Sequence, residues 1–158
     1  MSPLRGKAKT PAVLFFITHD CPIANAYARE YQRLLQEYSR YRLPMCLVYV
    51  DPDAKTAELK KHQTEFGLSK FTAIHDVKHR LVTATGAEMT PEVAVIGDDG
   101  KIEYRGRVDN LYADYGKRRR RVTVRDLRDA LDALVSGKPV KRPRTEPIGC
   151  FIPPLPEK

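Results

Sequence analysis

Cys21 is the residue of this chain best placed to do chemistry. It lies in the turn between a predicted buried strand, residues 12–17, and a predicted helix that has Pro22 in its first turn. The free backbone N–H groups and the positive end of the dipole at a helix N-terminus favour a thiolate over a thiol. A protonated His19 adds to this effect, and Asp20 opposes it. The position predicts a nucleophilic cysteine, and the alternative is an inert, small hydrophobic residue.

The other two cysteines are predicted to have different roles. Cys46 lies within an apolar run and is interpreted as a core residue. Cys150 lies in a proline-rich segment beyond Gly137, which spans up to about 40 Å when extended. The radius of gyration of such a domain is only about 15 Å. Cys150 can therefore reach Cys21 and resolve a sulfenic acid or mixed disulfide there; the alternative is that its segment only docks a hydrophobic tail.

Other candidate sites are weaker. His75 and His79 have a spacing that can bind a metal, but no third ligand accompanies them. We therefore predict neither a metal site nor a cofactor. The net charge of +8 is concentrated in the run Lys117–Arg121. We interpret this run as a solvated loop, in preference to a site for nucleic acid or an anionic protein or lipid surface.

Composition places the chain among ordinary single-domain proteins. It has 158 residues, of which 42 % are hydrophobic and 30 % are charged, so it is neither disordered nor membranous. No apolar run approaches the ~20 residues that span a bilayer. The basic segment 1–10 lacks the apolar region of a signal peptide. The sequence does not name the compartment: as given it indicates a cytoplasmic location, and removal of an upstream segment would be consistent with an exported one.

Two continuous apolar runs indicate the centre of a sheet. Residues 12–17 and 45–50 are apolar throughout, as in strands that are buried on both faces. Between them, apolar residues from Ile23 to Tyr41 recur at steps of three and four, which indicates one helix. Strands linked by a helix are parallel and joined by a right-handed crossover. These residues therefore predict a βαβ unit.

Two helices are predicted after this unit. Asp53 or Thr56 is expected to cap a polar helix that ends at Gly67. Asp76 is expected to cap a short helix that ends at Gly86.

An antiparallel pair of strands and a final helix complete the pattern. Residues 92–96 and 101–107 are predicted strands, joined by a Gly-Asp-Asp-Gly hairpin. Arg105 and Arg107 are two residues apart and are expected on one face. Thr123-x-x-Asp126 resembles a capping box before a helix that ends at Gly137.

The predicted architecture is one α/β domain with an extended tail. We expect a central mixed sheet of about four core strands, flanked by helices, within residues 1–137. Residues 138–158 form a proline-rich strap rather than a second domain. The oligomeric state is left open.

Several motifs resemble those of thioredoxin-fold redoxins, in the broad alkyl hydroperoxide reductase and thiol-specific antioxidant grouping. In chain order these are residues 15–24, 89–95, 98–101 and 104–107. The resemblance implies a thioredoxin-like fold and a cis Thr90–Pro91 peptide that faces the active cysteine. Ala24 replaces the second cysteine of the thioredoxin Cys-x-x-Cys. Thr18 and Cys21 match the peroxiredoxin Thr-x-x-Cys, whereas Leu14 replaces its proline and residues 88–91 contain no arginine.

The resemblance also implies a thiol-dependent oxidoreductase that reduces or exchanges disulfides or peroxides. Cys21 would be the nucleophile, Thr18 would orient the site, Pro91 would shape the substrate groove and keep metals away, and Cys150 would be the resolving cysteine. The thiol reductant is not identified by the sequence. The alternatives are a non-catalytic binding module for a redox or haem-protein partner, and copper delivery. Asn25 stands where copper chaperones of this fold have a second cysteine, which disfavours the latter.

Overall fold

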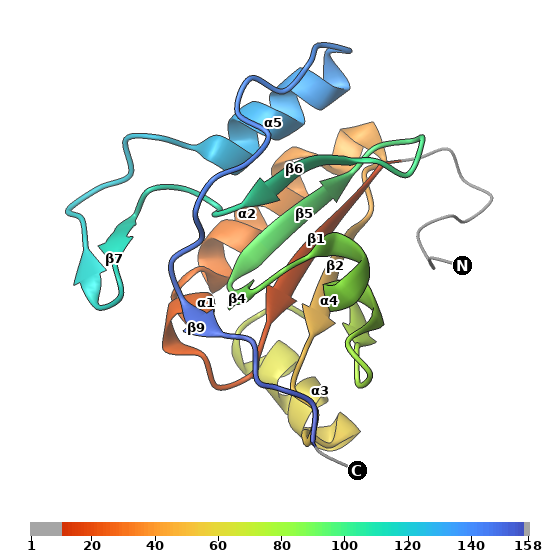
Figure 1. The fold of residues 1–158 in the computed structure, drawn as a ribbon, viewed down its shortest axis with the longest axis vertical. Helices are drawn as coiled ribbons and strands as arrows, with labels where there is room; N and C mark the ends of the chain where they lie inside the picture. The colour runs from red at the N-terminus through yellow and green to blue at the C-terminus, as the bar shows by residue number, and fades with distance from the viewer. Residues whose placement is uncertain (1–10, 157–158) are drawn as a thin grey trace.

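A five-stranded mixed sheet forms the centre of the molecule in the computed structural model, which describes residues 11–156 (Figure 1). Its strand order is β3-β2-β1-β5-β6. The strands are β1 Ala12–Ile17, β2 Met45–Tyr49, β3 Thr72–His75, β5 Glu92–Ile96 and β6 Ile102–Gly106. The predicted α/β fold with a central mixed sheet is confirmed.

The predicted βαβ unit is present at the middle of the sheet. β1 pairs in parallel with β2, with Val13 opposite Met45, and pairs antiparallel with β5 on its other side. β3 was not predicted, so the sheet has five strands rather than about four. The reason is that β3 is an edge strand whose sequence Thr-Ala-Ile-His is half exposed and lacks a continuous apolar run.

Both faces of the sheet are covered by packed side chains. Along β1, the side chains of Val13, Phe15 and Ile17 enter one core cluster, and those of Leu14 and Phe16 enter another. This alternation follows from the two-residue period of a strand. The first cluster includes residues of α1, α2, α3 and α5, whereas α4 packs in the second. The helices are α1 Pro22–Ala26, α2 Ala28–Glu37, α3 Thr56–Glu65, α4 Arg80–Thr85 and α5 Asp126–Val135, with a 3₁₀ turn at Ser39–Tyr41.

The single helix predicted from Ile23 to Tyr41 is interrupted. The break between α1 and α2 lies at Tyr27, whose backbone leaves the helical range with φ −91° and ψ 2°. The Tyr27 hydroxyl donates a hydrogen bond of 2.7 Å to Asp109, which lies far away in the sequence. Apolar periodicity continues through the break, so it could not be predicted from that pattern.

The predicted helix starts are partly correct. The N-cap residue of α4 is His79, but the Asp76 carboxylate caps the helix as expected, because it accepts the N–H groups of Arg80 and Leu81 at 2.8 and 3.0 Å. Lys55, rather than Asp53 or Thr56, precedes α3, and the Glu58 carboxylate accepts its N–H at 3.0 Å.

The predicted capping box at the start of α5 is wrong. Asp126 is the first residue of the helix, after Arg125. Its carboxylate pairs with Arg107 at 2.6 Å instead of reaching back to Thr123. The Thr123 N–H donates to the Asn110 side chain at 2.9 Å.

Arg105 and Arg107 do not share a face, contrary to the expectation from their spacing. Arg105 pairs with Glu92 at 3.2 Å and donates to the Thr85 carbonyl of α4, whereas Arg107 pairs with Asp126 of α5. Gly106 between them has a φ of 152°, which interrupts the strand alternation. A Cβ atom at Gly106 would lie 2.1 Å from the Thr145 hydroxyl oxygen, so only glycine admits this close approach.

The C-terminal strap, residues 138–156, runs from α5 across the end of the sheet (Figure 1). It is held beside β6 by the Arg105 N–H, which donates to the Pro143 carbonyl at 2.9 Å, and by the Thr145 N–H, which donates to the Arg105 carbonyl at 3.1 Å. It then forms β9, Cys150–Phe151, which pairs antiparallel with β4, Met89–Thr90.

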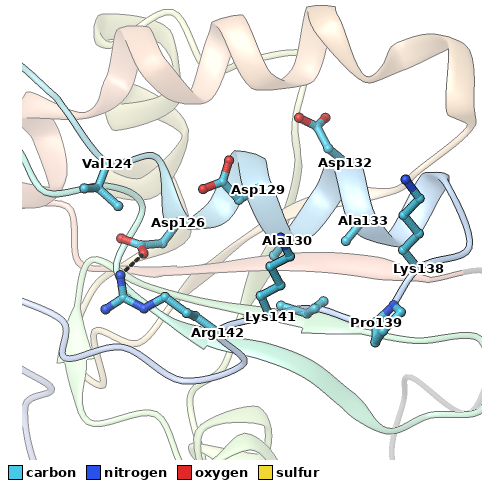
Figure 2. A pocket seen from close by; sticks show the side chains of 11 residues that line it. Val124, Asp126, Asp129, Ala130, Asp132, Ala133, Lys138, Pro139, Lys141 and Arg142 are labelled. Carbon is cyan, nitrogen blue, oxygen red and sulfur yellow. Dashed lines mark ion pairs between the residues drawn. The ribbon is translucent and has the colours of Figure 1, made fainter.

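A groove of about 570 Å³ separates the beginning of the strap from α5. Figure 2 shows the aspartates of α5 on one side of the groove and the strap cations on the other. Arg142 of the strap pairs with Asp126 at 3.5 Å. The groove is thus bridged by a contact that helps to hold the strap in place.

The basic run is exposed, as predicted; its first two residues belong to a hairpin, and residues 119–121 follow it outside any strand. β7, Tyr112–Asp114, pairs with β8, Lys117–Arg118. Within residues 11–156, no helix is long and apolar enough to cross a membrane. Segment 1–10, on which the absence of a signal peptide was predicted, lies outside the described residues.

Candidate active site

Cys21 occupies the N-cap position of α1, as the sequence predicts. Its backbone is extended, with φ −78° and ψ 114°, and Pro22 follows at the start of the helix. The Ala24 N–H points to the Cys21 Sγ atom at 3.4 Å. Cys21 is only 2 % exposed. A free N–H of the first helical turn is therefore directed at a buried sulfur, where it stabilises negative charge.

Cys150 lies directly beside Cys21. The two Sγ atoms are 2.8 Å apart, although 129 residues separate them in the sequence, and both thiols are free. The Cys21 Sγ atom is also 3.2 Å from the Thr90 carbonyl oxygen, to which its thiol donates. Three segments thus meet at one sulfur: the β1–α1 turn, β4 and the strap.

The environment of Cys150 keeps its sulfur protonated. Burial raises the pKa of the Cys150 thiol to about 12, and the hydrogen bond to Cys21 and the charges of Cys21 and Asp20 act in the same direction. Part of this effect comes from the hydrogen bond with Cys21 and from negative charge on its sulfur, so that part is present only while Cys21 is unoxidised. Oxidation of Cys21 removes that part and makes Cys150 easier to deprotonate.

The Thr90–Pro91 peptide is cis, as the resemblance implies, and it forms the wall against which the strap packs. Thr90 is opposite Cys150 in the β4–β9 pair. A Cβ atom at Gly149 would lie 2.0 Å from the Thr90 carbonyl oxygen. The strap backbone can therefore lie this close to Thr90 only because residue 149 is glycine.

Thr18 is buried near Cys21, and the contact that joins them is through the backbone. The Cys21 N–H donates to the Thr18 carbonyl at 3.5 Å. Among the described residues, no hydrogen bond joins the Thr18 hydroxyl to the Cys21 sulfur. Orientation of the site by this hydroxyl stays a prediction.

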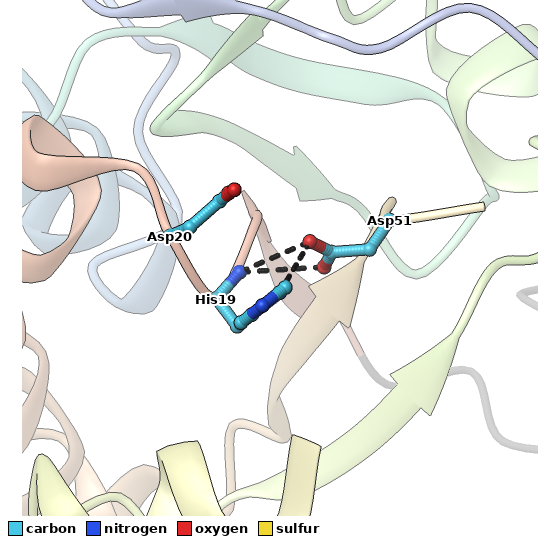
Figure 3. A group of neighbouring side chains, drawn as sticks. All are labelled: His19, Asp20 and Asp51. Carbon is cyan, nitrogen blue, oxygen red and sulfur yellow. Dashed lines mark hydrogen bonds and ion pairs between the residues drawn. The ribbon is translucent and has the colours of Figure 1, made fainter. Parts of the chain in front are cut away.

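His19 is paired with Asp51 rather than with a cysteine. Its Nδ1 atom is 2.7 Å from the Asp51 carboxylate, which also accepts the His19 backbone N–H at 3.3 Å (Figure 3). Together with Asp20, these groups offer ligand atoms within 4.8 Å of one another. A metal ion here would have to replace the hydrogen bond between His19 and Asp51, so the arrangement is satisfied without one.

A chain of hydrogen bonds extends from His19 into the protein. The Asn25 amide donates to the His19 carbonyl at 3.1 Å, and its oxygen lies 2.7 Å from His62 Nε2. His62 Nδ1 in turn lies 2.7 Å from the Tyr49 hydroxyl. Burial, followed by the charge of His19, lowers the pKa of His62. This network fixes the polar turn that precedes Cys21.

The remaining sequence candidates are structural. The His75 and His79 rings bond to the carbonyl oxygens of Asp51 and Val50, at 2.7 and 2.8 Å. Cys46 packs against the second core cluster, where burial raises the pKa of its thiol.

Glu92 is a residue of the site that the sequence analysis did not identify. Its buried carboxyl group accepts the N–H groups of Glu88 and Met89 at 2.8 and 3.0 Å and pairs with Arg105 at 3.2 Å. Burial, the largest influence, raises the pKa of Glu92. These bonds hold the segment that pairs with the strap. The sequence feature that could have identified Glu92 is its position as an acidic residue at the start of an otherwise apolar strand.

Comparisons with known proteins agree with this fold. The crystal structure of an uncharacterized conserved protein from Geobacillus kaustophilus is similar, with a TM-score of 0.82 and 28 % identity, over 96 % of this chain and 81 % of that one. A hypothetical protein from Sinorhizobium meliloti 1021 has a TM-score of 0.77 and 24 % identity, over 92 % and 80 % of the two chains.

A secreted Mycobacterium tuberculosis disulfide oxidoreductase shares the fold at a TM-score of 0.52 and 20 % identity, over 60 % of this chain and 67 % of that one. No curated protein matches the sequence. Residues 2–105 match the model of the AhpC/TSA family, which is more than half of the chain. The protein is therefore a thioredoxin-fold redoxin and belongs to the AhpC/TSA family.

Proposed function

We propose that this redoxin is a thiol-dependent oxidoreductase in which Cys21 is the nucleophile and Cys150 resolves its oxidised form. The observation that carries the proposal is the separation of 2.8 Å between the two sulfur atoms. A disulfide has an S–S bond of about 2.05 Å, so a small movement of the strap joins them. Cys150 thereby takes the place of the second cysteine that Ala24 removes from the helix.

The reaction begins when the Cys21 thiolate attacks the oxidant. With a hydroperoxide, the O–O bond breaks, an alcohol or water leaves after taking up a proton, and Cys21 becomes a sulfenic acid. Cys150 then attacks the Cys21 sulfur, and water leaves. With a disulfide, Cys21 forms a mixed disulfide and releases one thiolate, and Cys150 then displaces the other. Either route moves two electrons to the oxidant and leaves a Cys21–Cys150 disulfide.

The order of these steps follows from the two sulfur environments. Cys21 receives the Ala24 N–H, whereas the Cys150 pKa is raised to about 12. Cys150 therefore remains a thiol while Cys21 reacts. After Cys21 has been oxidised, its negative charge no longer opposes deprotonation of Cys150, and the resolving attack becomes easier.

The strap is part of the site under this proposal. Residues 11–137 supply the nucleophile and the cis-proline loop, and residues 138–156 supply the resolving thiol. A non-catalytic binding module has no need for a second sulfur against the first, so the proximity of the thiols favours the redox function over that alternative. Two adjacent sulfurs are also what copper(I) binds; copper delivery is disfavoured instead by the raised pKa of Cys150, because a thiol must lose its proton to bind a metal.

Mild oxidation followed by digestion and mass spectrometry tests the proposal. We expect hydrogen peroxide, or a small disulfide such as cystine, to produce a Cys21–Cys150 cross-link. Cys150→Ser should instead accumulate sulfenic or sulfinic acid on Cys21 after peroxide. Cys46→Ser is the matched control and should cross-link like the wild type. The redox mechanism is wrong if the wild type forms no cross-link and Cys21 stays unoxidised.

A further inference from the structure

The sulfur that a reductant can reach in the oxidised protein is that of Cys150. Cys21 is 2 % exposed, whereas Cys150 is half-buried and lines a pocket of about 510 Å³. The leaving sulfur matters as well, because the Ala24 N–H is directed at the Cys21 Sγ atom and stabilises the negative charge of a departing thiolate there. Both observations direct the attacking thiol to Cys150.

The pocket beside Cys150 is bordered by unusually exposed apolar side chains. Phe151 is 82 % exposed and Tyr115 is 62 % exposed, the two highest values among the large hydrophobic residues in 11–156. Both line this pocket, together with Met89 and Ile148. Exposed apolar groups that gather at one place mark interaction surfaces more often than groups scattered singly.

The same surface carries the strongest concentration of charge in the chain. Tyr115 is at the tip of the β7–β8 hairpin, and the five cations of Lys117–Arg121 follow it. All five are exposed, and none forms an ion pair within the described residues. The acidic groups nearby are Asp114, which lines the pocket, Asp20, which acts on Cys150, and the exposed Glu88 and Glu146, which adjoin the pocket residues Met89 and Pro147. The unpaired positive charge is therefore concentrated on the hairpin beside the pocket, and the fewer acidic groups lie at the pocket itself.

We propose that this Cys150 face, made of the pocket residues and the cationic hairpin, docks the protein that reduces the Cys21–Cys150 disulfide. The partner is a dithiol protein with an apolar contact and acidic side chains around its reactive thiol. The inference rests on the proposed function. A cationic hairpin that extends beyond the pocket fits a protein surface better than a small thiol, because a small thiol fills only the pocket.

The reduction balances with the partner as the source of two electrons. The first partner thiolate attacks Cys150 Sγ, which forms a mixed disulfide and releases Cys21 as a thiolate. The second partner thiol loses its proton and attacks the partner sulfur of that mixed disulfide. Cys150 leaves and takes up a proton, and the partner departs as a disulfide. The hairpin and the pocket accelerate the first step by holding the partner thiol at Cys150.

Reduction kinetics of the oxidised full chain test the docking surface. The probes are short dithiol peptides with leucines and glutamates around the cysteines, and matched peptides with lysines in place of the glutamates. Because opposite charges steer association by factors of about 10 to 1,000, we expect the acidic peptide to be at least about ten-fold faster. The advantage should disappear as the ionic strength rises from about 0.01 M to about 1 M, where the screening length falls to about 3 Å.

Variants test the cationic part and the apolar part of the surface separately. Replacing Arg118–Arg121 by serine should remove the preference for the acidic peptide, and Phe151→Ala or Tyr115→Ala should slow both peptides. The matched control replaces four exposed cations elsewhere, Lys60, Lys61, Lys70 and Lys78, and should retain the preference. Dithiothreitol, a neutral small dithiol, should reduce all these variants at the same rate. A peptide adduct quenched with acid should be found on Cys150.

The outcomes distinguish this proposal from the one on which it rests. If no Cys21–Cys150 disulfide forms, the proposed function fails first. If the disulfide forms but the two peptides react equally, or the adduct is on Cys21, the docking proposal is wrong and the redox function stands. If glutathione, a small anionic thiol, shows the same charge-dependent acceleration as the acidic peptide, the surface serves a small thiol and the protein partner is wrong.

Discussion

Gly149→Ala is the sharpest perturbation of the proposed redox pair, because it moves the strap without changing either cysteine. The added Cβ atom would lie 2.0 Å from the Thr90 carbonyl oxygen and 2.7 Å from its carbon. Real Cβ contacts are essentially never below 3.0 Å. The strap must therefore withdraw from β4 by about 1 Å or more, and Cys150 moves with it.

The expected effect is on the rate of disulfide formation. A displacement of 1 Å from a reactive geometry costs about 100-fold in rate. We expect the oxidised Cys21 of Gly149→Ala to be resolved about 100-fold more slowly than in the wild type, with more sulfinic acid on Cys21. Overpacking costs about 1–3 kcal/mol, which is less than the stability of a typical domain, about 5–15 kcal/mol, so the variant should remain folded.

The assay adds one equivalent of peroxide, quenches with an alkylating reagent at successive times and measures the cross-link by mass spectrometry. Leu155→Ala is the control, because it changes an exposed side chain of the same strap beyond β9. Leu155→Ala should form the Cys21–Cys150 disulfide at the wild-type rate. If Gly149→Ala also forms the disulfide at that rate, the position of the strap in this structure does not govern resolution, and the reasoning is refuted.

Three further predictions concern stability. The pKa of His62 is lowered below 6.5, so this side chain stays neutral in the folded protein at pH values where it is already protonated in the unfolded chain. The free energy of unfolding should therefore fall as the pH drops below 6.5, by at most about 1.4 kcal/mol per pH unit. His62→Gln should flatten this slope when the free energy of unfolding is measured by urea titration. Glu92 has a raised pKa, so the folded chain holds a proton that the unfolded chain loses above pH 4.5, and stability should decline as the pH rises through that window. Glu92→Gln should reduce this decline, and an unchanged slope would contradict the burial argument. Replacing Arg118–Arg121 by serine should leave the melting temperature nearly unchanged, because these side chains are exposed; unfolding at a clearly lower temperature would show that they are structural.

The central fold was predictable because its strongest signals are local. β1 and β2 are apolar throughout, and a helix-length segment lies between them, so their parallel pairing follows from general rules. Edge strand β3 has no such signal, since its outer positions face solvent. The break at Tyr27 arises where a side chain bonds to Asp109 across the fold, and no local pattern encodes that contact.

In the candidate site, too, local features could be predicted from the sequence and long-range contacts could not. The N-cap position of Cys21 is predictable from a strand, a polar turn and Pro22, which are adjacent in sequence. The distance to Cys150 depends instead on the path of the strap, which is held by pairs such as Tyr104 and Thr145, whose hydroxyl groups are 2.6 Å apart. Chain length showed only that Cys150 can reach Cys21. The contacts along the strap determine where Cys150 lies relative to Cys21.

The meeting of Cys21 with Cys150 has a consequence for the folding equilibrium. A bond between them would enclose a loop in which the two ends are 129 positions apart, nearly the whole molecule. Closing a loop of about 100 residues restricts the unfolded chain by about 4.7 kcal/mol in the chain-entropy description. Oxidation would thus stabilise the fold by about this amount, and by thermodynamic linkage the fold would stabilise the disulfide equally. Each turnover would then alternate between a less stable and a more stable fold, and the reductant would have to work against this linkage free energy of about 4.7 kcal/mol.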